Sequence, residues 1–205
     1  MTARPFPDWH KIYKDQAAER LPWYYPDLDP DLARALEARG IKAGRVLDLG
    51  TGPATQAYAL AALGFEVTAS DISEHAVEQG RAGAAERGLK IDFVRDDVLH
   101  SQLRAGFDLI FDRGCYHVFA PELRGHYAQT VARLLAPTGT FFLKCFSEEQ
   151  PGDVGPYQTS PEEARRVFGE HFEVLAIERT VYQGTLPVLP RALFCTLRLK
   201  GATQG

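Results

Sequence analysis

The residues best suited to chemistry surround a glycine-rich turn in the stretch VLDLGTG at 46–52. Gly50 and Gly52 follow a short apolar run, and glycines let a backbone turn tightly and approach a ligand closely. Asp71 ends a second apolar run, at the separation of about 20 residues from which a carboxylate can reach both hydroxyls of a ribose. The arrangement therefore predicts a cofactor that contains a nucleoside. The alternative is a tight turn with Asp71 as a helix cap.

Two further residues indicate which nucleoside. A dinucleotide-binding turn has a third glycine, and this chain has Thr55 at that position. Asp48 places a carboxylate where a pyrophosphate would lie, which is unfavourable for an anion. S-adenosylmethionine carries a sulfonium and an α-ammonium and has no phosphate, so the sequence favours it. A nicotinamide cofactor is the alternative.

A second candidate group follows the apolar run 107-FDLIFD-112. We expect Asp112 either to face the sulfonium end of the cofactor or the substrate, or to cap the next loop. Arg113 can hold an anionic substrate or favour a thiolate, or pair with Asp112 or Asp97. His117 has a pKa range suited to a general base, or it is a hydrogen-bonded wall residue. Tyr116 is expected in the core or in the substrate pocket wall.

The first 28 residues are rich in aromatic side chains between prolines, namely Trp9, Tyr13, Trp23, Tyr24 and Tyr25. One interpretation is a lid over the cofactor, in which ring faces of Tyr13 and Trp23 meet the sulfonium. The other is a flap packed on the sheet.

Five strand patterns alternate with helical patterns between residues 45 and 146. The strand patterns are RVLDLG, FEVTAS, IDFVRDD, FDLIFD and TFFLKCF. This alternation predicts a parallel sheet covered on both faces, with right-handed crossovers. The last two runs, FEVLAIERTVY and RALFCTLRLK, have no helix between them and predict an antiparallel edge hairpin. Asp29, Ser73 and Ser160 are the expected helix caps.

The expected fold is therefore α/β, a Rossmann-like, doubly wound, seven-stranded sheet, mostly parallel. We expect one domain over 1–205. It divides into an aromatic flap and helix (1–40), a cofactor-binding core (41–146), and a substrate-side loop, helix and hairpin (147–205).

Composition narrows the functional classes. The 205 residues carry a net charge of −4 without a basic block, which argues against nucleic acid or an anionic membrane as partner. There is no apolar run of the ~18–20 residues that a membrane span needs, and the first residues do not resemble a secretory signal. Three scattered cysteines predict a reducing, cytoplasmic location, and the dispersed histidines suggest no metal site.

At this point the chain resembles the class I S-adenosylmethionine-dependent methyltransferases. VLDLGTG is similar to their first motif, SDIS (70–73) to their second and FVRDDV (93–98) to their third. The resemblance implies that Asp71 binds the ribose, Asp97 the adenine amino group and the Val98 backbone the ring. The expected cofactor site comprises Tyr13, Trp23, Asp48, Gly50, Thr51, Gly52, Asp71, Ile72, Asp97, Val98 and Asp112.

A narrower resemblance is to the thiopurine S-methyltransferase group, whose relatives include halide, thiol and tellurite-resistance methyltransferases. It lies in FDRG (111–114), RGHYAQT (124–130) and GPYQTSPEEARRVFG (155–169). After the Asp-Arg-Gly, this chain has 115-CYH-117 where the group has small aliphatic residues. The expected function is methylation of a small molecule at sulfur or another soft nucleophile, with Arg113 and His117 catalytic and Tyr116 binding the substrate. The alternatives are a nicotinamide-dependent oxidoreductase and a non-catalytic S-adenosylmethionine-binding protein.

Overall fold

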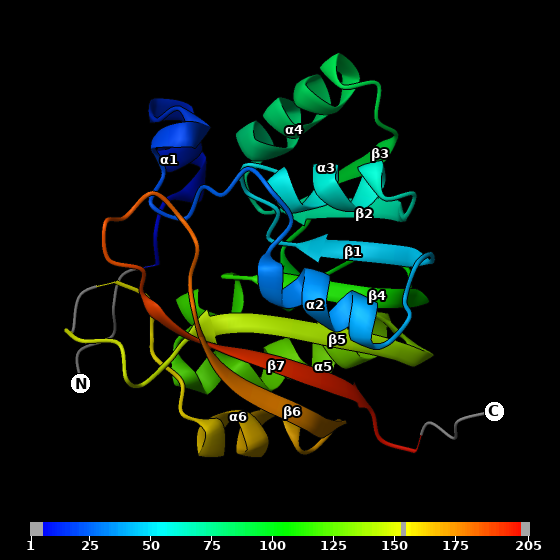
Figure 1. Ribbon diagram of the computed structural model, residues 1–205, viewed down its shortest axis with the longest axis vertical. Helices are drawn as coiled ribbons and strands as arrows, with labels where there is room; N and C mark the ends of the chain where they lie inside the picture. The colour runs from blue at the N-terminus through cyan, green and yellow to red at the C-terminus, as the bar shows by residue number, and fades with distance from the viewer. Residues whose placement is uncertain (1–5, 153–154, 202–205) are drawn as a thin grey trace.

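The computed structural model describes residues 6–152 and 155–201, which form one sheet with helices on both faces (Figure 1). The strand order is β3-β2-β1-β4-β5-β7-β6. Strands β1 to β5 are parallel to one another, and β7 lies antiparallel between β5 and β6. The predicted seven-stranded, doubly wound sheet with its antiparallel hairpin is confirmed.

The strands are β1 (Arg45–Leu49), β2 (Glu66–Asp71), β3 (Ile91–Arg95), β4 (Phe107–Arg113), β5 (Leu135–Phe146), β6 (Phe172–Val181) and β7 (Arg191–Leu199). The α-helices are α1 (Trp9–Asp15), α2 (Pro30–Ala38), α3 (Thr55–Ala62), α4 (Glu74–Glu86), α5 (Arg124–Leu134) and α6 (Pro161–Phe168). Short 3₁₀ turns are η1 (Ala18–Arg20), η2 (Val98–His100), η3 (Tyr116–Val118) and η4 (Pro121–Leu123). None of the described helices has the length and apolar character needed to cross a membrane.

The helix starts follow the predicted capping residues. Asp29 accepts a hydrogen bond from the Asp31 N–H at 3.0 Å, with Pro30 in the first turn of α2. The Ser73 hydroxyl accepts from Ala76 N–H at 3.3 Å, and the Ser160 hydroxyl from Glu163 N–H at 3.0 Å. Each cap satisfies a backbone donor that has no partner inside its own helix.

Two apolar cores lie on the two faces of the sheet. Helices α2, α3 and α4 cover one face, where Leu32, Leu60 and Val77 belong to one apolar cluster with side chains of β1, β2, β3 and β4. Helices α5 and α6 cover the other face, where Val131 and Phe168 are fully buried. Because both faces are covered, the central strands are apolar on both sides rather than alternating.

Strand β5 is longer than the sequence pattern indicates. The pattern predicts strand from Thr140, and the structure extends it back to Leu135, which pairs with Phe107 across an irregularity in the register. The expected helix from Pro121 instead begins with the turn η4 before α5.

The carboxyl ends of the parallel strands lie on the left of Figure 1. Helix α1, the loop before α6 and the loop between β6 and β7 gather at the same side. The fold thus brings three segments distant in sequence to the edge where open α/β sheets bind their ligands.

Candidate active site

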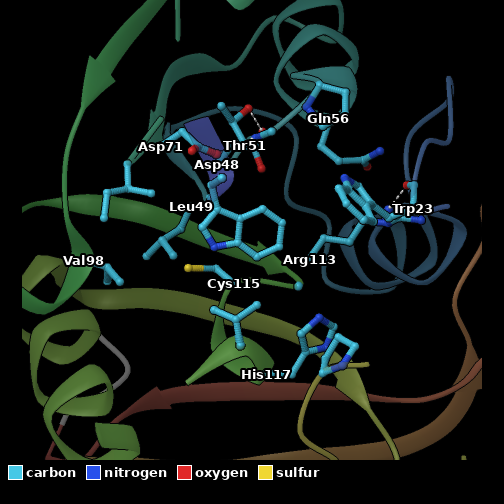
Figure 2. Close-up of a pocket in the computed structure, with 18 of the residues that line it drawn as sticks. Trp23, Asp48, Leu49, Thr51, Gln56, Asp71, Val98, Arg113, Cys115 and His117 are labelled. Carbon is cyan, nitrogen blue, oxygen red and sulfur yellow. Dashed lines mark hydrogen bonds between the residues drawn. The ribbon is translucent and has the colours of Figure 1, made fainter. Parts of the chain in front are cut away.

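A cavity of about 400 Å³ lies at the carboxyl ends of β1, β2 and β4. This volume is within the range of ~300–1,000 Å³ typical of small-molecule sites. Its walls come from the glycine turn, the N-terminal aromatic segment, the start of the loop after β4, Gln150, Gly155 and Pro156, and the loop at 182–190. Figure 2 shows Asp48, Thr51 and Asp71 at one end and His117 at the other. We call these the acidic end and the acceptor end.

The two predicted glycines have the backbone conformation that requires glycine. The φ angles of Gly50 and Gly52 are 70° and 49°, in the left-handed region. A Cβ atom on Gly52 would lie 2.6 Å from the Tyr13 hydroxyl, and one on Gly50 would lie 2.7 Å from the Cys115 Cβ. Neither position can carry a side chain without displacing a wall of the cavity.

Two carboxylates define the acidic end. Asp71 accepts hydrogen bonds from Gly52 N–H and Ser73 N–H, both at 2.9 Å, so it fixes the glycine turn and the position of Ser73, the residue that caps α4. Asp48 accepts from the Thr51 hydroxyl at 2.5 Å. Burial raises the pKa of Asp71, and it raises the pKa of Asp48 to about 6 despite that hydrogen bond. Buried carboxylates with raised pKa values favour a cationic neighbour.

The residues expected around the adenine are also at the cavity. Ile72, Asp97 and Val98 all line it. The Asp97 carboxylate already accepts from Leu99 N–H at 3.0 Å and lies 2.8 Å from His100 Nδ1. The neighbouring Asp96, which sequence reasoning did not select, lines the cavity as well. The sequence shows Asp96 and Asp97 together at the end of a strand, but it does not indicate which of the two side chains faces the cavity.

Three N-terminal aromatic residues form one wall. Trp9 lies 6.2 Å from Tyr13 and 5.9 Å from Trp23, ring centroid to ring centroid, and all three line the cavity. Tyr13 is only 6% exposed because its hydroxyl fits against Gly52. Burial and Asp71 raise its pKa, so it stays a neutral phenol. Tyr25 instead packs near Arg113, 5.9 Å from its guanidinium carbon. The wall exists as expected; whether it opens stays a prediction.

The structure corrects the expectation that Asp112 faces the cofactor. Its carboxylate is fully buried and accepts from the N–H groups of Gly114, Cys115 and Tyr116 at 2.7–2.9 Å. It also accepts from the Tyr127 hydroxyl. Burial raises the Asp112 pKa to about 6. Asp112 caps the loop after β4, the alternative that the sequence left open, and it is not a lining residue.

Tyr116 is also displaced from its expected place. It is fully buried, with its ring 5.3 Å from those of Tyr127 and Phe168 and beneath the Arg124 guanidinium. The turn that Asp112 caps directs Tyr116 into the core and leaves its neighbours at the cavity. The expectation that Tyr116 binds substrate is therefore wrong in this structure.

Arg113 lines the cavity but is held by the protein. Its Nε donates to Asp29 at 2.9 Å, Nη1 to the Trp23 carbonyl at 3.0 Å and Nη2 to the Gln183 carbonyl at 2.6 Å. Its side chain is 7% exposed. The expected ion pair with Asp112 or Asp97 is replaced by one with Asp29. Arg113 joins the aromatic wall to the β6–β7 loop, an arrangement that does not support its expected role of holding an anion.

His117 lines the acceptor end, and its environment argues against a general base. Its Nδ1 accepts from Phe146 N–H at 3.2 Å. Burial, with Arg124 and Arg113 nearby, lowers its pKa to about 3. The imidazole is therefore neutral near pH 7 and a poor proton acceptor. This environment favours the alternative that the sequence left open, a hydrogen-bonded wall residue, over the expected base.

Several lining residues were missed by sequence reasoning. They come from segments without regular pattern or from positions that look structural: Leu49, Gln56, Cys115, Phe119, Tyr182 and Leu186. The Cys115 thiol faces the cavity (Figure 2), and burial with nearby carboxylates raises its pKa, so it stays protonated. Within residues 6–152 and 155–201, no cluster of histidine, cysteine and acidic residues is arranged to hold a metal.

The acidic end fits S-adenosylmethionine on the evidence of its own residues. Two buried carboxylates lack a cationic side chain among their hydrogen-bond partners in the described chain, which suits a sulfonium and an ammonium. The close approach at Gly50 and Gly52 leaves room for a nucleoside, and Asp71 has the position for its ribose.

Comparison with known proteins identifies the family of this chain. The family model for thiopurine S-methyltransferase matches residues 6–191. A 2-heptyl-1-hydroxyquinolin-4(1H)-one methyltransferase of Mycobacteroides abscessus is 31% identical over 78% of this chain and 72% of its own length. A probable thiol methyltransferase of Arabidopsis thaliana is 28% identical over 78% of this chain and 70% of its own length.

Among solved structures, a protein from a study of disulfide-to-thioacetal conversion in echinomycin biosynthesis has a TM-score of 0.83 and 24% identity, over 96% of this chain and 92% of that chain. The fold and site thus define a class I S-adenosylmethionine-dependent methyltransferase. More narrowly, the chain belongs to the thiopurine S-methyltransferase family, and it is an enzyme with S-adenosylmethionine as cofactor and a small molecule as substrate. This membership favours a methyltransferase over the nicotinamide-dependent and non-catalytic alternatives.

Proposed function

We propose that the protein methylates a small, soft nucleophile, most simply a thiol or another acceptor with an exposed lone pair. The observation that carries the proposal is the acceptor end of the cavity. Phe146 packs against His117 there, and Phe119, Leu186 and Pro190 add apolar wall to the same cavity. Among the described residues, no carboxylate is hydrogen-bonded to the His117 side chain. A soft nucleophile reacts without strong polar activation, so an apolar wall suffices to hold it.

The related proteins support the same choice. One is named for a thiol acceptor, a second is a thiocyanate methyltransferase of Brassica oleracea that is 25% identical, and a third is named for an N-hydroxyquinolone. These acceptors share small size and a polarisable or readily ionised nucleophilic atom. The cavity volume of about 400 Å³ must hold cofactor and acceptor together, which limits the acceptor to a small molecule.

Bound S-adenosylmethionine supplies an activated methyl group on a sulfonium with a good leaving group. The chain's own task is to align the acceptor atom at ~3–3.5 Å from that methyl carbon and to exclude water. Trp9, Tyr13 and Trp23 close one side of the cavity, and the β6–β7 loop with Tyr182 closes the other. Arg113 joins these walls through the Trp23 and Gln183 carbonyls.

The roles of the cofactor-site residues belong to this proposal. Asp71 holds the ribose, Gly50, Thr51 and Gly52 form the turn beneath the cofactor, and Asp48 faces its cationic end. Ile72, Asp97 and Val98 surround the adenine, with Tyr13 and Trp23 above. Their support is that all of them line one cavity.

The organisation and location of the chain are part of the proposal too. The three expected stretches, 1–40, 41–146 and 147–205, act as one methyltransferase domain, because described parts of all three build the cavity walls. The cysteines are free thiols, in keeping with a cytoplasmic enzyme. The net charge of −4 favours small acceptors over nucleic acid.

The test is a product assay with purified enzyme across alkyl and aromatic thiols, iodide, an N-hydroxyquinolone, phenols and amines. We expect methylated product and S-adenosylhomocysteine in equal amounts with thiols, iodide or the N-hydroxy compound. Preferential turnover of amines would refute the proposal. The Asp71→Ala variant is the control, because it should lose turnover at low cofactor concentration with every acceptor.

A further inference from the structure

The imidazole of His117 is held in one orientation by the backbone. Phe146 N–H, on β5, donates to Nδ1 at 3.2 Å. The ring packs edge-on against Phe146, 4.8 Å between centroids, and at 5.7 Å from Tyr182. A neutral imidazole has one N–H donor and one acceptor. Since Nδ1 is the acceptor here, the hydrogen must lie on Nε2.

The Nε2–H group is left available for a ligand. In the described part of the chain it has no hydrogen-bond partner, and it is not among the polar atoms sealed from solvent. It lies beside Gly114, where an added Cβ would stand 3.2 Å from it. The missing side chain at position 114 thus keeps Nε2 clear, and His117 lines the cavity at the acceptor end (Figure 2).

The other ionisable groups at this end cannot take a proton from the acceptor. The Tyr182 hydroxyl donates to the Lys144 carbonyl at 2.9 Å, and burial raises its pKa well above the usual value. The Cys115 thiol stays protonated for the same reason. Arg113 and Arg124, the charged groups nearest the imidazole, are paired with Asp29 and Glu163. Their positive charge opposes protonation of His117 and contributes to its lowered pKa.

We propose that the acceptor binds as an anion already formed in solution, and that Nε2–H of His117 donates a hydrogen bond to its nucleophilic atom. This inference rests on the proposed function and defines its substrate class as acceptors that are ionised, or carry no proton, before they bind. A lone pair of the anion forms the bond to the methyl carbon, and the carbon–sulfonium electron pair stays on the departing sulfur. No proton moves, and a cation and an anion become two neutral products.

The pH dependence of kcat/KM, at saturating cofactor, tests the first half. We expect kcat/KM for an alkyl thiol to rise to a plateau above the thiol pKa of ~8.5. A more acidic nitro-substituted aromatic thiol should reach its plateau at lower pH, and iodide should be independent of pH. A base mechanism requires the neutral thiol, so its kcat/KM would fall above the thiol pKa. Such a fall would overturn the inference while leaving the proposed function standing.

Three variants test the second half. His117→Asn keeps an acceptor near Nδ1 for Phe146 N–H but has no donor at the Nε2 position. His117→Gln places an amide donor there, and His117→Phe keeps neither group. We expect His117→Asn and His117→Phe to lower kcat/KM by about 10- to 100-fold for thiolate and iodide alike, and His117→Gln to retain most of the wild-type value. A loss on thiols that spares iodide would restore His117 as a base, and no loss on either would place it outside the acceptor site.

Nitrogen NMR of the histidine side chains gives a readout independent of turnover. The signal lost in His117→Asn should belong to an Nε2–H imidazole that stays neutral down to about pH 5. An Nδ1–H form, or titration near pH 6.5, would overturn the inference even in an active enzyme. If the enzyme binds cofactor but methylates no thiol, halide or N-hydroxy compound, the proposed function fails, and this inference fails with it.

Discussion

Lys144 offers the sharpest test of how the walls of the cavity are held. It lies on β5 and is fully buried, and its Nζ contacts Asp29 at 2.8 and 3.0 Å, Asp31 at 2.7 Å and Gln183 Oε1 at 2.6 Å. With Arg113, which also pairs with Asp29, these groups form a buried cluster of two cations and two anions. The cluster ties the start of α2 to β5 and to the β6–β7 loop. We expect Lys144→Met to be strongly destabilising.

The magnitude follows from the charge left behind. Methionine keeps most of the side-chain volume, so little packing is lost, but the buried cluster then has one uncompensated negative charge. Removing one partner from a buried ion pair typically costs ~3–5 kcal/mol. That is a large part of the ~5–15 kcal/mol that stabilises a domain. At roughly 2–4 °C per kcal/mol for a chain of this size, Tm should fall by roughly 6–20 °C.

The assay is urea unfolding of the wild type and of Lys144→Met, with Arg34→Met as the matched control. Arg34 also pairs with Asp31, but its side chain is 57% exposed, so its loss should cost less than ~1 kcal/mol. Adding Asp31→Asn to Lys144→Met restores neutrality, so the double variant should cost less than the sum of the single ones. If Lys144→Met costs no more than Arg34→Met at an unchanged m-value, the reasoning is refuted.

Three other predictions concern the cofactor. Asp71→Ala should weaken S-adenosylmethionine binding by about 10- to 100-fold in calorimetric titration, because a charge-assisted contact is lost. The control Asp15→Ala, at an exposed position, should leave the affinity unchanged. Equal affinities of the wild type and Asp71→Ala would contradict the ribose role. Since the Asp48 pKa is raised to about 6, the negative charge of Asp48 appears as pH rises through that value, and cofactor affinity should increase between about pH 5 and 7 and then level off. Asp48→Asn should remove this pH dependence of the affinity. An unchanged pH dependence in that variant would assign the titration to another group. S-adenosylhomocysteine should slow tryptic cleavage after the exposed Arg20 but not after Arg104, and equal slowing would mean general stabilisation rather than closure of the aromatic wall.

The features that could be predicted from the sequence depend on neighbours along the chain. The caps at Asp29, Ser73 and Ser160 each bond a backbone N–H two or three residues away. The glycine turn follows directly from its strand, and Asp71 reaches it from the end of the adjacent strand, as the parallel order requires. Periodicity and turn chemistry contain this information, so the fold and the acidic end were predictable.

The acceptor end depends on contacts between distant segments, which one sequence does not reveal. Arg113 binds Asp29 and Gln183, which are 84 and 70 positions away from it in the sequence. The tautomer of His117 is set by a backbone N–H 29 residues further on. Nothing in the apolar strand sequence around Lys144 indicates its three partners, Asp29, Asp31 and Gln183. Tyr116 directly precedes His117, yet its side chain points into the core, because Asp112 caps the turn that leads from β4 to Tyr116.

The two ends of the cavity differ in charge in the sense that the reaction requires. Asp48 and Asp71 give the acidic end negative potential for a cationic cofactor, whereas the Nε2–H of His117 offers a hydrogen-bond donor to an anion at the acceptor end. Methyl transfer from a cation to an anion spreads and then cancels charge. Water stabilises the separated charges more than the transition state, so an apolar cavity that replaces water with a few fixed dipoles lowers the barrier. The protein can therefore promote the reaction without a proton acceptor, provided that each charged reactant is bound at its own end.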